Sequence, residues 1–524
     1  MTVRQLILRG LVGATLSAAL LQLLIDCSIE NVACVGLVLA SSLGILLYMA
    51  RTRALEIQPL STFAIFGFCT TTQLGALLAQ TAAWTALRSS LYTPVYTFGV
   101  LAFYQAIAIT VHATYCLFTT PSAKVTPLRS LLDGMGLYRT PSAGASWVMG
   151  IVGLSAFPFA NGPGIFNKIC SAFIFLTWAP FLLPVYRIAD PGRSRGPLTS
   201  AVLLTAYALL VCLLGMAVNA RAVMFLGVVT VALIYLFVGL RSSTIVSRTA
   251  LVRIAGLALV GLGISAPLAD LATAMEIARA SRGKIPPLEM IQNTLTLWGR
   301  PYALQKYRAA KDAATRTAYD EKYIANPLLA RFVETKFHDN SLHFAGLLTT
   351  QANKAKLADI TLQSMWATLP TPFLDALGIK VDKDKLGFST GDYVVYLSRG
   401  VPLGGRRTGS MIAEGITLLG GPLFSLVYAG MCLLVFAIMD LLTVRPLSGV
   451  PTMTPLAMMR LWTLFLYGIT AESFGVMCTF YARDVAQMIL LYSLVLGIAS
   501  LLLRRRSTRA GPMSLLRGLE DASH

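Results

Sequence analysis

Apolar stretches of about 20 residues recur along most of the chain, and they constrain its fold more than any other feature. A stretch of this length is what a helix needs to cross a bilayer. The mean hydropathy is +0.68. Only 13% of the residues are charged, whereas charged residues make up roughly a quarter of an ordinary soluble domain. The sequence therefore predicts an all-α, polytopic integral membrane protein.

About 12 stretches qualify as candidate transmembrane helices. The first follows directly on Met1–Arg4, and because further apolar stretches come at once, we expect a retained span and not a cleaved signal peptide. The candidates are 7–27, 32–50, 60–84, 97–119, 144–160, 167–186, 199–218, 222–240, 251–269, 413–441, 458–480 and 486–503.

The placement of charge predicts the orientation of these spans. With the N-terminus in the cytoplasm, 19 arginines and lysines fall in or beside the cytoplasmic loops and tail, and four fall in the short opposite loops. Cytoplasmic loops are enriched in basic residues, so both termini are expected in the cytoplasm. The net charge of +19 is then explained by topology, and no nucleic-acid partner is predicted.

A long polar segment, residues 270–411, follows the ninth candidate span and is expected outside, because long segments are exported regardless of their charge. Four regions result: N-terminal spans (1–269), the outer segment (270–411), three C-terminal spans (412–503) and a basic cytoplasmic tail (504–524). Periodicity and proline breaks predict three helices in the outer segment, which would form a cap on the membrane surface. They cover Tyr302–Tyr323, Asn326–Leu348 and Gln351–Thr368.

The stretch RFVETKFHDNSLHF, at 331–344, gathers polar side chains within the second of these helices. On one helix, Arg331 would share a face with His338, and Asp339 would lie beside His343. Two interpretations stay open: a solvated helix face, or a histidine that accepts a proton from a hydroxyl. The histidines are five residues apart, whereas two ligands of one zinc on a helix are typically four apart, so no metal site is predicted.

Arginines at the outer ends of spans are candidate ligands of a phosphate group. Arg221, in MAVNARAVMFLG, would lie at the outer entrance of a span, either as a membrane anchor or as a phosphate ligand. Others would lie near the outer ends of further spans: Arg399, Arg406, Arg407 and Arg483. Several arginines at one face predict a site for a lipid-linked phosphate or pyrophosphate.

Other kinds of site find little support. The eight cysteines lie in or beside apolar stretches without CxxC spacing, which indicates neither a disulfide framework nor a zinc site. There is no Walker loop, and Asp382 and Asp384 form only a lone DxD pattern. No cofactor is predicted. His112 and Glu472 are ionisable residues within apolar stretches, and such residues are candidates for function.

Several segments resemble Wzy-type polymerases of oligosaccharide repeat units. GRRTGSMIAEGITLLGGPLFSLVYAG, at 405–430, is similar to the family's segment that enters the membrane after the large outer loop, with a polar stretch, an acidic residue (Glu414) and a glycine pair. NARAVMF resembles the arginine that heads an outward-starting span, and YARDVAQMILL the last outer turn, with Arg483 and Asp484. PLLARFVETKFHDNSL resembles a helix of the large loop.

The resemblance implies a GT-C-like fold in the bacterial inner membrane and an inverting, metal-independent glycosyl transfer. A growing glycan would leave its undecaprenyl pyrophosphate and join a hydroxyl of a newly exported repeat unit. A chain-length regulator and a flippase of the same pathway would be partners. The implied bases are His338, Asp339, His343 and Glu414, and the implied pyrophosphate ligands are Arg221, Arg331, Arg399, Arg406, Arg407 and Arg483.

Two other functions share this layout. An O-antigen ligase would transfer the glycan to a different acceptor, which the sequence does not identify. A transporter or flippase of lipid-linked sugars also suits about 12 spans, although such proteins often contain repeated halves, and none is visible in this sequence.

Overall fold

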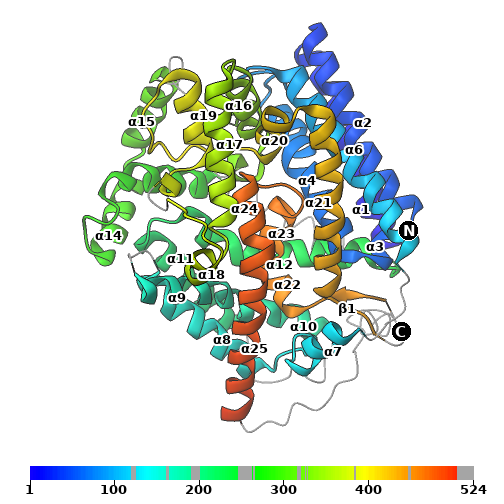
Figure 1. Cartoon of the computed structure of the whole chain (residues 1–524), viewed down its shortest axis with the longest axis vertical. Coiled ribbons are helices and arrows are strands. Elements are labelled where there is room, and N and C mark those ends of the chain that lie inside the picture. The colour runs from blue at the N-terminus through cyan, green and yellow to red at the C-terminus, as the bar shows by residue number, and fades with distance from the viewer. Residues whose placement is uncertain are drawn as a thin grey trace.

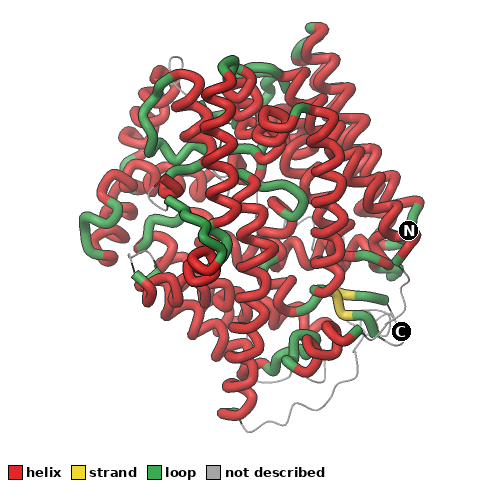
Figure 2. Tube along the Cα trace, in the orientation of Figure 1, coloured by secondary structure: helices red, strands yellow, loops and turns green. Residues whose placement is uncertain are grey.

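Nearly every element of the chain is a helix (Figures 1 and 2). The computed structural model describes residues 1–119, 126–160, 164–189, 201–245, 263, 266–314, 320–324, 326, 329–382, 385–446 and 450–503. By length and composition, eight helical runs in these residues can cross a membrane. They are Val3–Ile25, Ile29–Arg51, Pro59–Ala82, Pro94–Phe118, Phe166–Tyr186, Arg221–Arg241, Gly421–Leu441 and Phe474–Leu502. An all-α, polytopic membrane protein is thereby confirmed.

The elements before residue 245 form the N-terminal part of the bundle. They are α1 (Val3–Ile25), α2 (Ile29–Arg51), α3 (Ala54–Ile57), α4 (Pro59–Cys69), the π-helical η1 (Thr70–Leu74), α5 (Gly75–Ala82), α6 (Pro94–Phe118), α7 (Pro127–Gly134), α8 (Ala143–Ala156), η2 (Phe157–Phe159), α9 (Ile165–Phe173), η3 (Ile174–Leu182), α10 (Leu183–Ala189), α11 (Ala201–Ala217) and α12 (Arg221–Arg241).

After residue 266, short helices alternate with two long ones. Residues 266–278 are helical. They are followed by η5 (Arg279–Ser281), α14 (Pro287–Trp298), α15 (Pro301–Ala314), η6 (Leu329–Phe332), α16 (Thr335–Gly346), α17 (Gln351–Trp366), α18 (Thr371–Ala376), η7 (Lys385–Gly387), α19 (Thr390–Arg399), α20 (Met411–Leu419), α21 (Gly421–Leu441), β1 (Thr443–Val444), β2 (Thr452–Met453), α22 (Pro455–Met459), α23 (Leu461–Tyr467), α24 (Phe474–Cys478), the π-helical η8 (Thr479–Asp484) and α25 (Val485–Leu502).

One end of the bundle holds the start of the chain, and we call it the N-terminal end. Thr2 pairs with Ile245 in an isolated β-bridge. Arg4 Nη1 lies 2.9 Å from Glu56 Oε1. These contacts fix the start of α1 to the end of α12 and to α3.

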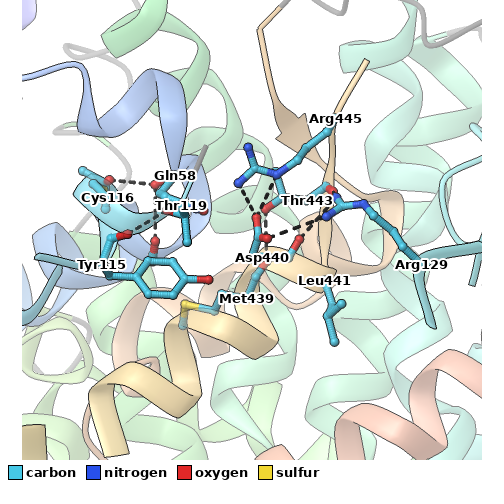
Figure 3. A network of polar contacts seen from close by, with 12 residues as sticks. Gln58, Tyr115, Cys116, Thr119, Arg129, Met439, Asp440, Leu441, Thr443 and Arg445 are labelled. Carbon is cyan, nitrogen blue, oxygen red and sulfur yellow. Dashed lines mark hydrogen bonds and ion pairs between the residues drawn. The ribbon is translucent and has the colours of Figure 1, made fainter. Parts of the chain in front are cut away.

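Figure 3 shows a second group of contacts at this end, around Asp440 near the end of α21. Arg445 donates from Nε to Asp440 Oδ1 at 3.0 Å, and Arg129 of α7 lies 3.6 Å from Asp440 Oδ2. Nearby, Gln58 donates to Thr119 Oγ1 at 3.1 Å and joins the start of α4 to the end of α6. Arginines that the charge pattern assigns to one side of the membrane thus gather at one end of the bundle.

The opposite end carries α16, α17, α19 and α20. There α16 packs against the start of α6, and α17 packs against α24. Figure 1 shows α17 upright beside α24, with α18 below it. The helices of the 270–411 segment therefore cover this end of the bundle and do not stand apart from it.

Four of the predicted spans differ in the structure. Residues 143–159 and 201–217 form apolar helices shorter than a full span. In the predicted span 413–441, α20 ends at Gly420, whose φ of +75° favours glycine, and Pro422 starts α21. The predicted span 458–480 is divided among α22, α23 and α24. Most of the predicted span 251–269 lies outside the described residues.

The final predicted turn is wrong as well. Phe474–Leu502 is one helical run, so Arg483 and Asp484 lie within a helix, in the π-helical η8, and not in a turn between two spans.

Within the 270–411 segment, only α17 closely follows its predicted bounds. The helix expected up to Tyr323 ends at Ala314. The helix expected over 326–348 is replaced by η6 and α16, because the backbone N–H of Glu334 donates to Thr71 O at 2.8 Å and leaves the helical path. Arg331 and His338 therefore do not share a helix face. The Arg331 side chain lies outside the described residues.

Candidate functional site

A cavity of about 420 Å³, which we call the main cavity, lies where distant parts of the chain meet. Its walls come from α17, from residues 386–390, from the α22–α23 region and from residues 471–484. The volume is within the range of small-molecule sites. Its polar lining residues are Ser364, Ser389, Thr390, Arg460, Thr463, Tyr467, Glu472, Ser473, Thr479 and Asp484.

Among the residues that the structure describes, Arg460 is the one cation that lines the main cavity. It occupies the break between α22 and α23, and its guanidinium lies 5.7 Å from the Phe480 ring centroid. Its Nε atom is buried and has no hydrogen-bond partner in the described part of the chain. The Asp484 carboxylate attracts it electrostatically from the same wall. A guanidinium held in this way can bind an anionic ligand through two parallel N–H donors.

Glu472 borders both the main cavity and a smaller one. Burial raises the pKa of its carboxyl group, and the nearby Glu321 carboxylate raises this pKa further. Among the described residues, no hydrogen-bond donor engages the Glu472 carboxylate. A carboxylate with a raised pKa that faces a cavity is suited to accept a proton.

The smaller cavity has a volume of about 10 Å³, close to the space of a single water molecule. Its polar lining is Thr72, Glu334, His338, Thr408, Thr470 and Glu472. Three residues line both cavities, namely Tyr467, Ala471 and Glu472, so the smaller cavity, which His338 also lines, adjoins the main one.

His338 is buried and not part of a solvated helix face. Its Nδ1 atom lies 2.8 Å from Ser410 Oγ. Burial lowers the pKa of the imidazole to about 4, so the side chain is neutral at pH 7. A neutral imidazole beside the smaller cavity can accept a hydrogen bond or a proton there.

Asp339 is also fully buried, and its carboxylate binds the backbone at the start of another helix. It accepts hydrogen bonds from the backbone N–H groups of Tyr92 at 2.7 Å and Thr93 at 2.9 Å, and from Thr97 Oγ1 at 3.0 Å. Lys336 Nζ lies 3.3 Å away. The carboxylate thus caps the start of α6 and does not hydrogen-bond His343, its expected partner.

His343 lies instead against an aromatic ring. Its imidazole stacks on Tyr92, with ring centroids 4.3 Å apart and an interplanar angle of 11°. Arg399 lies over the neighbouring Phe344, 4.9 Å from the ring centroid. Burial lowers the pKa of His343, and the positive charge of Arg399 lowers it further. Neither His343 nor Arg399 lines the main cavity.

Glu414 joins three elements in the interior. Its Oε2 atom accepts the backbone N–H of Phe474 at 2.9 Å, at the start of α24, and the Thr361 hydroxyl of α17 donates to its Oε1 atom. Burial raises the pKa of Glu414 to about 7. The residue is therefore placed to hold α17, α20 and α24 together.

Three of the predicted arginines pair with carboxylates from different elements. Arg221 lies 3.4 Å from Glu276 Oε2. Arg407 lies 2.9 Å from Asp392 Oδ1, and the backbone N–H of Arg406 donates to the other oxygen of Asp392 at 2.9 Å. Arg483 pairs at 3.0 Å with Asp484, and through Asp484 it alone among them reaches the wall of the main cavity.

Both π-helical segments adjoin these cavities. Thr72 of η1 lines the smaller cavity, and Thr479, Phe480 and Asp484 of η8 line the main one. π-Helical turns are rare and occur often at functional sites. Their position supports the choice of these cavities as the candidate site.

The sequence contains a feature that marks Arg460 as a candidate functional residue. Arg460 is one of the 19 basic residues that the charge pattern assigns to the cytoplasmic side, yet it follows PTMTPLAMM and precedes LWTLFLY, within an apolar stretch. A charge inside an apolar stretch is itself a reason to suspect function. Among the described residues, no group of three or more His, Cys, Asp or Glu side chains is arranged to hold a metal ion.

Comparison of the chain with protein-family models, with curated proteins and with solved structures finds no match.

Proposed function

We propose that this chain is a bacterial polysaccharide polymerase that joins undecaprenyl-pyrophosphate-linked oligosaccharide repeat units at the outer face of the cytoplasmic membrane. The observation that carries the proposal is the main cavity, in which Arg460, with its buried Nε unpaired among the described residues, faces the same space as Glu472. A cation for a leaving phosphate and a carboxylate for a hydroxyl proton are the two groups that this transfer needs.

The roles follow from the charge that develops in the reaction. The hydroxyl oxygen of the acceptor sugar bonds to the anomeric carbon of the donor while the bond from that carbon to the pyrophosphate breaks. The electron pair leaves with the pyrophosphate, where Arg460 stabilises the added charge. The hydroxyl proton passes to Glu472, whose raised pKa favours this acceptance.

His338 would interact with Glu472 indirectly, through water. It lines the smaller cavity, and a single water in that cavity would link its imidazole to the Glu472 carboxylate. Hydroxyl groups on the wall, among them Thr463 and Thr479, would orient the sugars.

The orientation in the membrane is part of the proposal. The described arginines at the N-terminal end, Arg4, Arg129 and Arg445, support a cytoplasmic location for that end. The main cavity, bordered by α17 and by residues 386–390 at the opposite end, would then face outward, where exported repeat units are found.

The test is complementation of a deletion strain, with the polysaccharide resolved on a gel. We expect the wild-type chain to restore long glycans, Arg460→Ala to leave single repeat units, and Arg460→Lys to restore little, because an ammonium lacks the two parallel donors. Arg300→Ala, at an exposed residue before α15, is the matched control and should restore long glycans.

Other outcomes of the deletion identify the other two functions. Unmodified acceptor core with long glycans still present on the lipid carrier would indicate a ligase. Lipid-linked units that accumulate facing the cytoplasm would indicate a flippase. Long glycans of normal length with Arg460→Ala would overturn the assignment of the main cavity.

A further inference from the structure

Five large apolar side chains follow one another along α17 and α18 and lie exposed. They are Leu362, Trp366, Leu369, Phe373 and Leu377, spaced four, three, four and four residues apart, and each is between 36% and 65% exposed. All five lie outside the eight candidate spans. We call them the apolar strip.

The part of α17 that carries the strip lies along the start of a candidate span. Ser364 is so close to α24 that a Cβ atom added at Gly475 would come within 2.2 Å of its Oγ. Thr368 Oγ1 lies 3.1 Å from Thr479 Oγ1. Gly475 and Thr479 both belong to the run Phe474–Leu502. This part of the chain therefore lies beside the first turns of a helix that is long and apolar enough to cross a membrane.

The strip points away from the protein interior. On the other side of α17, Leu357 and Thr361 are buried, and Ile360 and Ser364 line the main cavity. Val476, in the first turn of the neighbouring span, is 47% exposed and extends the apolar surface onto a helix that can cross the membrane. Exposed apolar side chains thus occur both on the strip and on the neighbouring candidate span.

We propose that the apolar strip is embedded in the boundary between the bilayer and water, where it contacts phospholipid acyl chains. A surface with one apolar face and a polar opposite face binds at this boundary, and tryptophan is enriched there. The exposed Asp359 and Asp375 on the same two helices would remain in the aqueous layer.

This location gives the main cavity a wall that borders lipid. A ligand with a long hydrocarbon chain can then leave that chain in the bilayer while its polar head enters beside α17. The inference concerns the position of α17 and α18 only, so it stands or falls independently of the proposed polymerase activity.

The test places a photoreactive benzophenone side chain at the position of Phe373 or, as the matched control, of Asp375 in the full chain. Each protein is reconstituted in nanodiscs that contain tritiated phosphatidylglycerol and phosphatidylethanolamine and is then irradiated. A second pair of positions, Trp366 and Asp359, repeats the comparison on α17. The readout is radioactive lipid attached to the protein, which does not depend on glycan synthesis.

We expect several-fold more lipid adduct at the positions of Phe373 and Trp366 than at those of Asp375 and Asp359. Equal labelling within each pair would overturn the proposal. Protein–protein adducts in place of lipid adducts at Phe373 would overturn it too, because the strip would then be covered by a second chain.

Discussion

The Asp339 carboxylate holds the start of α6 as a helix cap and pairs with a buried lysine. Replacement by alanine leaves two backbone N–H groups and the Lys336 ammonium without their acceptor in a dry environment. Loss of one partner of a buried pair costs about 3–5 kcal/mol. We therefore expect Asp339→Ala to lower the yield of folded protein and its melting temperature in detergent, measured by size exclusion and thermal unfolding.

Two further variants serve as comparisons for Asp339→Ala in this experiment. Asp339→Asn keeps an oxygen that can accept from the α6 backbone, so it should fall between alanine and wild type. Asp375→Ala, at an exposed position, should melt like wild type. A stable Asp339→Ala protein that has lost only polysaccharide synthesis would instead indicate that Asp339 takes part in the reaction.

The buried Glu414 predicts a pH-dependent stability. Its pKa is raised from 4.5 to about 7, so the folded state binds the proton more tightly than the unfolded state. This contribution is complete below pH 4.5 and is lost as the pH rises through about 7. Its size is on the order of 3 kcal/mol. The wild-type melting temperature should fall between pH 5 and pH 8 relative to that of Glu414→Gln.

Glu289→Gln is the control for this titration, because Glu289 is exposed at the start of α14. Its melting temperature should follow that of wild type at every pH. Parallel curves for wild type and Glu414→Gln would show that Glu414 does not titrate in this range.

At the scale of single residues, the sequence identifies polar residues but not their partners. The stretch 331–344 contains a buried histidine and a buried aspartate, and its polarity does not predict that burial. Their environments come from residues far away in sequence, Ser410 for His338 and residues 92–97 for Asp339. Helical spacing describes neighbours on one helix only, and here the helix begins later than its pattern indicates.

At the scale of elements, close backbone contacts shape the candidate site. A Cβ atom added at Gly409 would lie 2.6 Å from the backbone oxygen of Glu472. Because that neighbour is backbone, the segment that carries Glu472 has to shift. We expect Gly409→Ala to cost about 1–3 kcal/mol and to shorten the polysaccharide on a gel.

Gly346→Ala is the matched substitution, because nothing lies within 4 Å of a Cβ atom at Gly346. It should leave both the melting temperature and the polysaccharide unchanged. Long glycans made by Gly409→Ala at wild-type levels would mean that the position of Glu472 tolerates displacement, contrary to its proposed role.

Long apolar helices were predictable because hydropathy alone specifies them. The regions where helices are interrupted were not predictable in this way. Helices α22 and α23 are too short to span a membrane, and the interruptions fall at Arg460 and around Gly468. A Cβ atom added at Gly468 would collide with the backbone oxygen of Leu464 and with the Ala64 side chain. A window of hydropathy averages over such breaks. The main cavity owes its shape to them.

At the scale of the whole molecule, topology is the property to measure. We expect alkaline phosphatase, which is active only after export, to be active when fused after the exposed Gly283 and inactive when fused after Gly134. Green fluorescent protein at the C-terminus should fluoresce, because that end is predicted in the cytoplasm. The reverse pattern would invert the molecule and place the main cavity on the cytoplasmic side.

Charge bias predicts which loops lie together, and the structure gathers Arg4, Arg129 and Arg445 at one end accordingly. Charge bias cannot predict which helices touch, because packing depends on side chains facing one another across the bilayer. The segment 270–411 shows the difference: charge bias does not indicate that α17 and residues 386–390 of this segment line the main cavity.

The β-bridge between Thr2 and Ile245 has a consequence for biosynthesis. Helix α1 acquires this partner only after more than two hundred further residues have been made. Until then, the start of α1 can contact Glu56 and Met49 through Arg4, but not the residues that follow α12. Truncation before Ile245 should therefore yield an α1 that is inserted but more readily extracted or degraded than in the full chain, and completion of α12 marks the point in synthesis at which this contact at the start of α1 can form.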